Sequence, residues 1–189
     1  AFPASPPALP TDDAGPEILA ACQEHLARRG FSQYEVSAYA RTERRCRHNL
    51  NYWTFGDYLG IGAGAHGKLT FPETQSIVRT TQLREPRRYL AAPPGANKRS
   101  VVGREDLPFE FMLNALRLTH GFEIDTFAAR TGLAWESLER SLRHLTSRGL
   151  IELQGRRCRP TTLGSRFLND VLLTFMPENA GHRVLSTGI

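Results

Sequence analysis

The sequence of 189 residues lacks any apolar run close to the roughly 18 residues of a membrane-spanning helix. Its first residues, Ala1-Phe2-Pro3-Ala4-Ser5-Pro6-Pro7, lack the basic start and apolar centre of a secretory signal. An initiator methionine is also missing, so we expect residue 1 to lie inside a longer protein. No transmembrane segment and no export signal are therefore predicted for this chain.

Paired cysteines are the second absence. The three cysteines, Cys22, Cys46 and Cys158, lie far apart, and their number is odd. Without a CxxC or CxxxC pair, the chain alone is not expected to form a disulfide framework, a zinc site or an iron–sulfur site. This pattern is typical of a reducing compartment, and a cytoplasmic location is predicted.

A strong charge of one sign is missing as well. The chain has 24 Lys and Arg against 19 Asp and Glu, and residues 104–177 hold 10 against 9. Such a balanced segment is a poor electrostatic partner for nucleic acid, so no nucleic-acid binding is predicted. Residues 1–103 are more basic, with 13 against 9, which is compatible with a peripheral contact to an anionic membrane.

The first 92 residues alternate helix and strand signals. Apolar spacing predicts a helix over 16–28, which Gly30 ends, and β-forming residues predict a strand over 31–39. A polar loop over 41–57, a short strand over 58–61 and a strand or hairpin over 69–81 follow, with its turn near Phe71-Pro72-Glu73. A short helix is expected near 84–91. This order indicates an α/β domain over residues 1–92.

A second domain is predicted after a linker at 93–103, which opens with Pro93-Pro94-Gly95. Residues 104–177 show three helical stripes, a two-stranded β-wing around Gly155 and a last helix over 167–175. This order is that of a small α+β domain of winged-helix type. The segment 135–148 would be its recognition helix, although its mixed charge favours a packing module over a DNA reader. Residues 178–189 are expected to be a disordered tail.

The segment His48-Asn49-Leu50-Asn51-Tyr52-Trp53 concentrates chemically useful side chains. The imidazole of His48 can bind a metal, Asn49 offers amide hydrogen bonds, and Tyr52 and Trp53 form flat aromatic surfaces. Haem would use such groups, with the nearby arginines Arg44, Arg45 and Arg47 for its propionates. From these residues alone, a loop anchored by its asparagines and aromatic rings is the stronger interpretation.

A glycine run, Gly60-Ile61-Gly62-Ala63-Gly64-Ala65-His66-Gly67-Lys68, follows shortly afterwards. It matches GxGxxG and nearly matches GxxxxGK[ST], but Leu69 stands where the phosphate loop needs a hydroxyl. Both motifs also need a helix directly after the glycines, whereas a strand is predicted here. The glycines therefore indicate a close backbone approach, either to a ligand or to a neighbouring strand. Taken alone, His66 is best interpreted as a hydrogen-bonded loop residue.

Three segments together resemble the HemW-type haem chaperones, relatives of the oxygen-independent coproporphyrinogen III oxidases. They are Gln33-Tyr34-Glu35-Val36-Ser37-Ala38-Tyr39-Ala40, Cys46-Arg47-His48-Asn49-Leu50-Asn51-Tyr52-Trp53 and Gly56-Asp57-Tyr58-Leu59-Gly60-Ile61-Gly62-Ala63-Gly64-Ala65-His66-Gly67. The HNxxYW pattern is the specific part and is closer to the chaperones than to the oxidases. The resemblance runs from the Pro-rich start to about Phe175.

The resemblance implies the end of an incomplete radical-SAM α/β barrel over residues 1–92, followed by a HemN-like C-terminal domain. Family members bind a [4Fe–4S] cluster and S-adenosylmethionine, but the CxxxCxxC cluster motif is absent here. This chain alone is thus expected to hold no cluster and to perform no radical chemistry. By resemblance, Gly64, Ala65 and His66 approach S-adenosylmethionine, and His48, Asn49, Tyr52 and Trp53 contact haem, with His48 as the iron ligand.

The function implied is haem binding and its delivery to apoproteins. Two alternatives stay open at this point. One is an oxygen-independent coproporphyrinogen III oxidase of tetrapyrrole biosynthesis, which would make the intact protein an enzyme. The other is a winged-helix nucleic-acid-binding protein, which the near-neutral charge of residues 104–177 disfavours.

Overall fold

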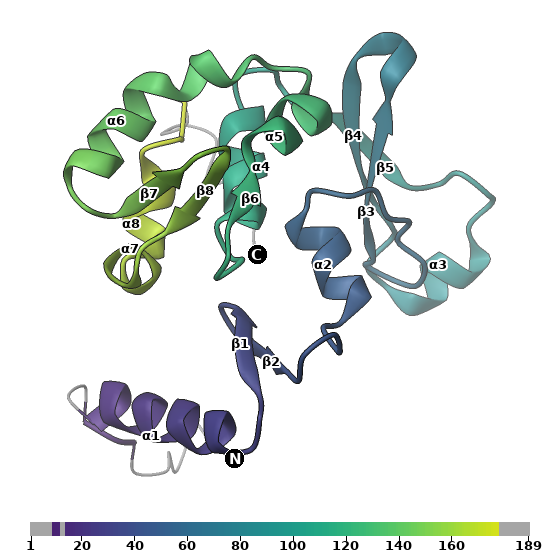
Figure 1. Ribbon diagram of the computed structural model, residues 1–189. Helices are drawn as coiled ribbons and strands as arrows, with labels where there is room; N and C mark the ends of the chain where they lie inside the picture. The colour runs from purple at the N-terminus through teal and green to yellow at the C-terminus, as the bar shows by residue number, and fades with distance from the viewer. Residues whose placement is uncertain (1–8, 12–13, 178–189) are drawn as a thin grey trace. The chain divides into compact units, whose positions relative to one another are not determined.

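The computed structural model describes residues 9–11 and 14–177 (Figure 1). The chain divides into two compact units, residues 1–46 and 47–189. The predicted tail at 178–189 lies outside the described residues. Among the helices of the described part, none has the length and apolar character that a membrane crossing requires.

The first unit consists of helix α1 (Ala14–Arg28) and a hairpin of β1 (Ser32–Glu35) and β2 (Ala38–Ala40). Gly30, with φ of 78°, ends α1 in the left-handed conformation, as predicted. The single strand predicted over 31–39 is wrong, because the chain reverses at Val36 and Ser37. Glu35 stabilises this turn by accepting hydrogen bonds from the backbone N–H and hydroxyl of Ser37. Alternating β-formers do not reveal such a reversal, since both arms of a hairpin alternate.

The second unit begins with α2 (Arg47–Trp53) and an antiparallel sheet in the order β3-β4-β5. Its strands are β3 (His66–Phe71), β4 (Ser76–Thr81) and β5 (Lys98–Val101), with a 3₁₀ turn η1 (Pro72–Thr74) and helix α3 (Pro86–Ala91) between them. The hairpin register runs from His66 opposite Thr81 to Phe71 opposite Ser76, so the predicted hairpin is confirmed. The strand predicted over 58–61 is wrong: Tyr58 alone forms a bridge, to Lys68.

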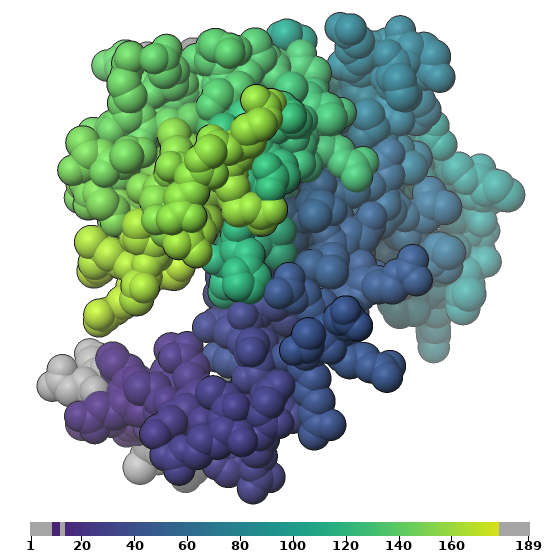
Figure 2. Space-filling view, in the orientation of Figure 1, coloured from purple at the N-terminus to yellow at the C-terminus, as the bar shows by residue number. Residues whose placement is uncertain are grey.

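Residues 98–101, within the range expected to be a linker, pair with β4 as strand β5. The backbone N–H of Val102 continues this contact by donating to the carbonyl of Ile77. The division of the chain at residues 92 and 104 stays a prediction. Side chains from residues 47–101 and from residues 104–177 are in direct contact in the space-filling view (Figure 2).

The C-terminal part combines helices with an antiparallel sheet in the order β6-β8-β7. Its elements are α4 (Leu107–Ala115), β6 (Phe122–Glu123), α5 (Ile124–Thr131), η2 (Trp135–Leu138), α6 (Glu139–Ser147), β7 (Ile151–Gln154), β8 (Arg157–Pro160), α7 (Thr162–Arg166) and α8 (Leu168–Leu173). The predicted three helices, wing and last helix are recovered. Three details differ: β6 adds a strand, residues 135–138 are 3₁₀, and a break at Phe167 divides the last helix.

Aromatic rings form the centre of the core in this part. Phe111 makes edge-to-face contacts with Phe122 and Phe127, at ring-centroid distances of 5.0 and 5.2 Å. Trp135 packs against the latter two rings. Cys158 is fully buried beside them, and burial raises the pKa of its thiol to about 12. Such a thiol is a small apolar side chain and not a nucleophile.

Candidate functional site

The HNxxYW segment forms helix α2 and not the loop that the sequence predicted. Histidine, asparagine and aromatic residues are weak helix formers, so local propensity argued against a helix. The helix is stabilised by packing against α4 and by its C-terminal end. There the N–H of Phe55 donates to the carbonyl of Tyr52, and the N–H of Gly56 donates to that of Asn51. These two bonds satisfy the last carbonyls of the helix as a Schellman motif.

Phe55 occupies the left-handed position of this motif, with φ of 57°. A non-glycine residue rarely adopts this conformation, and burial of the side chain offsets its cost. The ring is 1% exposed and packs edge-on against Phe111 of α4, with ring centroids 5.6 Å apart. Gly56 must lack a side chain, because a Cβ there would lie 2.2 Å from Oδ1 of Asn51. The end of α2 is thus fixed in the core.

Three rings, His48, Tyr52 and Tyr58, form a contiguous aromatic row. The His48 ring contacts Tyr52 edge-on at 4.7 Å, and Tyr52 lies 4.2 Å from Tyr58 between centroids. His48 is exposed, whereas the two tyrosines are half-buried. Among residues 9–11 and 14–177, no hydrogen bond to the His48 imidazole is found, so the ring nitrogens remain available to a ligand.

Trp53 lies next to the row but in a different environment. The guanidinium of Arg117 lies 4.3 Å from the centre of its ring, so one face of the indole is already covered. Its Nε1 is buried and has no hydrogen-bond partner in the described part of the chain. Asn49 is half-buried. The structure therefore brings His48 and Tyr52 together on one face of α2, whereas Trp53 contacts the C-terminal part.

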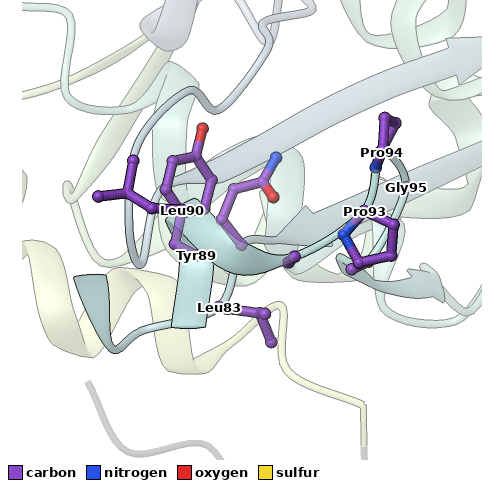
Figure 3. Close-up of a pocket in the computed structure, with 9 residues that line it drawn as sticks. Leu83, Tyr89, Leu90, Pro93, Pro94 and Gly95 are labelled. Atoms are coloured by element: carbon purple, nitrogen blue, oxygen red, sulfur yellow. The ribbon is translucent and has the colours of Figure 1, made fainter. Parts of the chain in front are cut away.

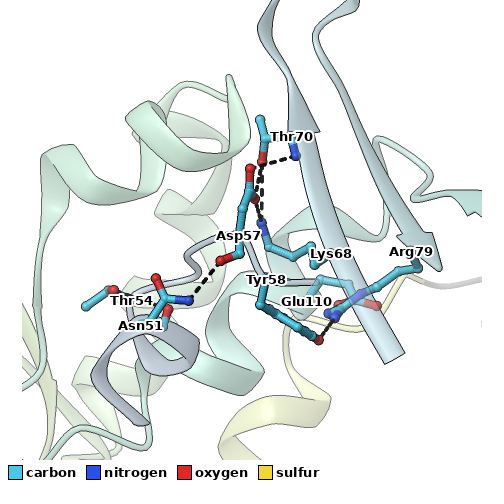
Figure 4. A network of polar contacts seen from close by, with 8 residues as sticks. All are labelled: Asn51, Thr54, Asp57, Tyr58, Lys68, Thr70, Arg79 and Glu110. Atoms are coloured by element: carbon cyan, nitrogen blue, oxygen red, sulfur yellow. Dashed lines mark hydrogen bonds and ion pairs between the residues drawn. The ribbon is translucent and has the colours of Figure 1, made fainter. Parts of the chain in front are cut away.

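A polar cluster that the sequence did not predict connects α2 to the sheet (Figure 4). Nζ of Lys68 donates to Oδ1 of Asp57 at 2.8 Å and lies 4.3 Å above the ring of Phe55. The backbone N–H and hydroxyl of Thr70 also donate to Asp57, and the amide of Asn51 donates to its carbonyl. Asp57 thus receives bonds from both α2 and β3.

The charges in this cluster depend on each other. Burial would raise the pKa of Asp57, but hydrogen bonds from Lys68 and Thr70 outweigh it and hold the pKa below its usual 3.8. Burial lowers the pKa of Lys68, and the Asp57 carboxylate opposes that shift. Because the Lys68 side chain is almost fully buried, its ammonium needs this partner. Spacing along the chain gave no signal for the pair, since its members lie eleven positions apart.

The glycine run contacts a neighbouring strand, one of the two alternatives left open. A Cβ at Gly60 would lie 2.4 Å from the carbonyl oxygen of His66, and one at Gly67 would lie 2.4 Å from Oγ1 of Thr80. No helix follows the run, since β3 begins at His66. The interpretation of both phosphate-loop matches as coincidental agrees with this geometry.

The predicted S-adenosylmethionine residues use most of their backbone groups internally. The N–H of Gly64 donates to the carbonyl of Leu83, and the N–H of Ala65 donates to the carbonyl of Gly62. The carbonyl of Ala65 accepts a hydrogen bond from the N–H of Gln82. His66 is exposed, with Nδ1 3.3 Å from the hydroxyl of Thr81. Within the described ranges, no hydrogen bond to the Gly64 carbonyl or to Nε2 of His66 is found, so these two groups remain for a ligand. A cofactor role for these residues stays a prediction.

A shallow pocket lies beside this loop (Figure 3). Its lining comes from the segment after β4, from α3 and from the turn that follows α3, and includes Leu83, Tyr89, Leu90 and Pro93. The hydroxyl of Tyr89 accepts a bond from the N–H of Gly62, so α3 supports the glycine run. The pocket carries no ionisable side chain besides the phenol of Tyr89.

Metal-binding groups are sparse. In the part of the chain that the structure describes, no three His, Cys, Asp or Glu side chains converge on one point. All three cysteines are free, and only Cys22 and Cys46 are exposed. The residues present therefore do not fit an iron–sulfur cluster, whereas a single-imidazole ligand to iron is available at His48.

Helix α6 was the candidate recognition helix. Arg143, on its exposed surface, forms an ion pair with Glu139 one turn earlier, at 2.8 Å. Leu142 and Leu145 are buried on the opposite side. Ion pairing leaves fewer positive charges for phosphates, and the burial of both leucines is expected for a packing helix.

Comparisons with known proteins show which family this chain is similar to. The family model described as the HemN C-terminal domain matches residues 102–167. The chain is 41% identical to the haem chaperone HemW of Escherichia coli over 94% of its own length and 46% of the relative. For the HemW of Haemophilus influenzae, the identity is 39% over 92% of this chain and 45% of the relative. The chain thus spans about half the length of these curated relatives.

The fold is also that of a solved relative. Coproporphyrinogen III oxidase (HemN) from Escherichia coli, described as a radical SAM enzyme, superposes with a TM-score of 0.61 over 88% of this chain and 42% of that chain. The identity is 15%, so this likeness concerns the fold alone. The predicted fold class, an α/β part followed by a HemN-like domain, is thereby confirmed. The chain belongs to the HemW family, and its residues 102–167 match the HemN C-terminal domain.

Proposed function

We propose that the protein to which this chain belongs binds haem and delivers it to apoproteins in the cytoplasm. The exposed His48 imidazole, held by Tyr52 and free of hydrogen bonds among the described residues, is the observation that carries this proposal. Imidazole is a common axial ligand of haem iron. The similarity to relatives named haem chaperone HemW supports the same conclusion.

Haem is here the cargo and has to leave again. One exposed imidazole beside a half-buried tyrosine ring offers a contact that an acceptor protein can displace. Arg47, directly before His48 on α2, is exposed and supplies a charge for a propionate. Tyr52 provides the aromatic surface, with Asn49 as a hydrogen-bonding neighbour. Trp53 contributes through the face that Arg117 leaves uncovered.

The cofactors of the complete protein belong to the same proposal. A [4Fe–4S] cluster requires ligands from outside this chain, since its three cysteines are far apart and Cys158 is buried. S-adenosylmethionine would meet the Gly64 carbonyl and Nε2 of His66, which form no hydrogen bond within the described part of the chain. The free cysteines are consistent with a reducing compartment.

The test is a haem titration of the complete protein followed by its Soret absorbance. We expect wild type to shift the Soret band and His48→Ala to weaken binding by at least about tenfold, roughly 1.4 kcal/mol. His144→Ala, which removes an exposed imidazole from α6, is the matched control and should bind as wild type does. His66→Ala separates the two candidate histidines.

Two outcomes would contradict the proposal. If wild type gives no Soret shift, the protein does not hold haem, and decarboxylation of coproporphyrinogen III becomes the activity to measure. If His48→Ala and wild type titrate alike, haem binds elsewhere and His48 is not its ligand.

A further inference from the structure

The orientation of the His48 imidazole depends on its neighbours in the aromatic row. His48 touches Tyr52 edge-on, and Tyr52 in turn touches Tyr58. No hydrogen bond among the described residues fixes the imidazole itself. The edge contact with Tyr52 positions the imidazole, so a change in Tyr58 that moves the Tyr52 ring is transmitted to His48.

The backbone and the ring of Tyr58 are fixed by different partners. Its N–H and carbonyl both pair with Lys68 of β3, at 2.9 Å each. This bridge fixes the backbone of Tyr58 but does not determine its side-chain torsion angles. The phenol oxygen accepts a hydrogen bond from Nη1 of Arg79 at 2.8 Å. The contact with Arg79 is therefore what selects the orientation of the ring.

The position of Arg79 is fixed in turn by a residue of the C-terminal domain (Figure 4). It lies on β4 and forms an ion pair with Glu110 of α4. The side chains of Arg79 and Glu110 are 28% and 26% exposed, so water screens this pair less than a fully exposed one. A charge-assisted bond to a fixed carboxylate restricts the guanidinium, which then presents its other nitrogen to Tyr58.

We propose that Arg79, anchored by Glu110, is a positioning residue that orients Tyr58 and, through Tyr52, the His48 imidazole that receives haem. This inference rests on the proposed haem site. It gives the HemN C-terminal domain a part in the site, because Glu110 lies within the matched residues 102–167. The domain would support the ligand without touching it.

The first measurement needs no haem. In the complete protein, the NMR resonances of the His48 ring report its position relative to the Tyr52 ring current. Arg79→Met and Tyr58→Phe are expected to shift these resonances, and Arg79→Lys to restore part of the shift. The matched control is Arg157→Met, which breaks the ion pair between Arg157 of β8 and Glu123 of β6 and removes no residue of the row. Unchanged His48 resonances in folded Tyr58→Phe, which loses one oxygen and keeps its ring, would overturn the inference.

The second measurement is a double-mutant cycle on haem affinity. Arg79→Met is expected to weaken binding about 3- to 10-fold and to alter the high-spin to low-spin ratio of the bound haem. In the His48→Ala background the same substitution should have no further effect. An equal loss in both backgrounds would overturn the inference, since Arg79 would then act on folding in general. Absence of haem binding by wild type would refute the proposed function, and the His48 resonances would still decide the positioning role.

Discussion

Two regions of the second unit are stabilised by different kinds of contact. The helical and winged part, residues 104–177, encloses a continuous apolar core that includes Phe111, Phe127 and Leu145. Of residues 47–101, all of which the structure describes, Phe55 and Ile77 are the buried apolar side chains, joined by the buried Lys68 and Thr80. The region with the candidate site therefore depends on ion pairs, ring contacts and close glycine packing more than on a core of its own.

The two regions therefore have different structural roles: residues 104–177 form a support, and residues 47–101 carry the candidate site. A dense core tolerates little rearrangement and makes a rigid support. Residues 47–101 contribute two side chains, Phe55 and Ile77, to that core and attach the rest of the site through polar contacts. The site is thus held in place by the neighbouring domain.

The largest expected effect is the loss of a core ring. Phe111→Ala removes a side chain that contacts Phe55, Phe122 and Phe127, and should lower the free energy of unfolding by about 3–5 kcal/mol. Urea unfolding followed by circular dichroism measures it. Leu173→Ala, on a 61% exposed side chain, is the control and should change little. A loss under about 1 kcal/mol for Phe111→Ala would contradict the rigid support.

A smaller and asymmetric effect is expected for the Asp57–Lys68 pair. Asp57→Ala leaves the buried ammonium of Lys68 without its carboxylate, which should cost about 2–3 kcal/mol. Lys68→Met should cost less, because Asp57 is 39% exposed and keeps both water and Thr70 as partners. Thermal unfolding of the two variants compares them directly. Equal destabilisation would mean that the buried charge does not dominate this region.

The smallest effect concerns pH. Because the folded protein holds the pKa of Asp57 below 3.8, the unfolded chain takes up the proton first as pH falls. The contribution of Asp57 to stability is therefore present above pH 3.8 and is lost as pH falls through its lowered pKa. Unfolding between pH 6 and 3 should show a shallower loss of stability in Asp57→Asn than in wild type. Identical slopes would contradict this assignment.

The sequence predicted the features that depend on local order. The hairpin at 66–81 follows from β-forming residues around a proline turn, and the wing around Gly155 has the same origin. Helix α2 was missed because its residues have weak helical propensity, and its stability comes from α4 and from the buried left-handed Phe55. Packing partners distant in sequence decided that element.

The candidate site could likewise be predicted only in part, because some of its contacts join residues that are distant in sequence. The HNxxYW pattern singled out His48 and Tyr52, which the structure places in contact. Neither Lys68 nor Arg79 carried a sequence signal, because their partners Asp57 and Glu110 lie 11 and 31 positions away. Residues so far apart in sequence come into contact only when the sheet and α4 pack together.

The burial of Cys158 helps an experiment that follows ligand binding at the site with a fluorescent label. The buried thiol is inaccessible and its pKa is raised, so maleimide reagents should react with the exposed Cys22 and Cys46 instead. Of the three cysteines in this chain, Cys46 would then be the reactive one after Cys22→Ser, and a fluorophore on it would lie two residues before His48. Quenching of that dye would then report the arrival and departure of a coloured ligand in real time.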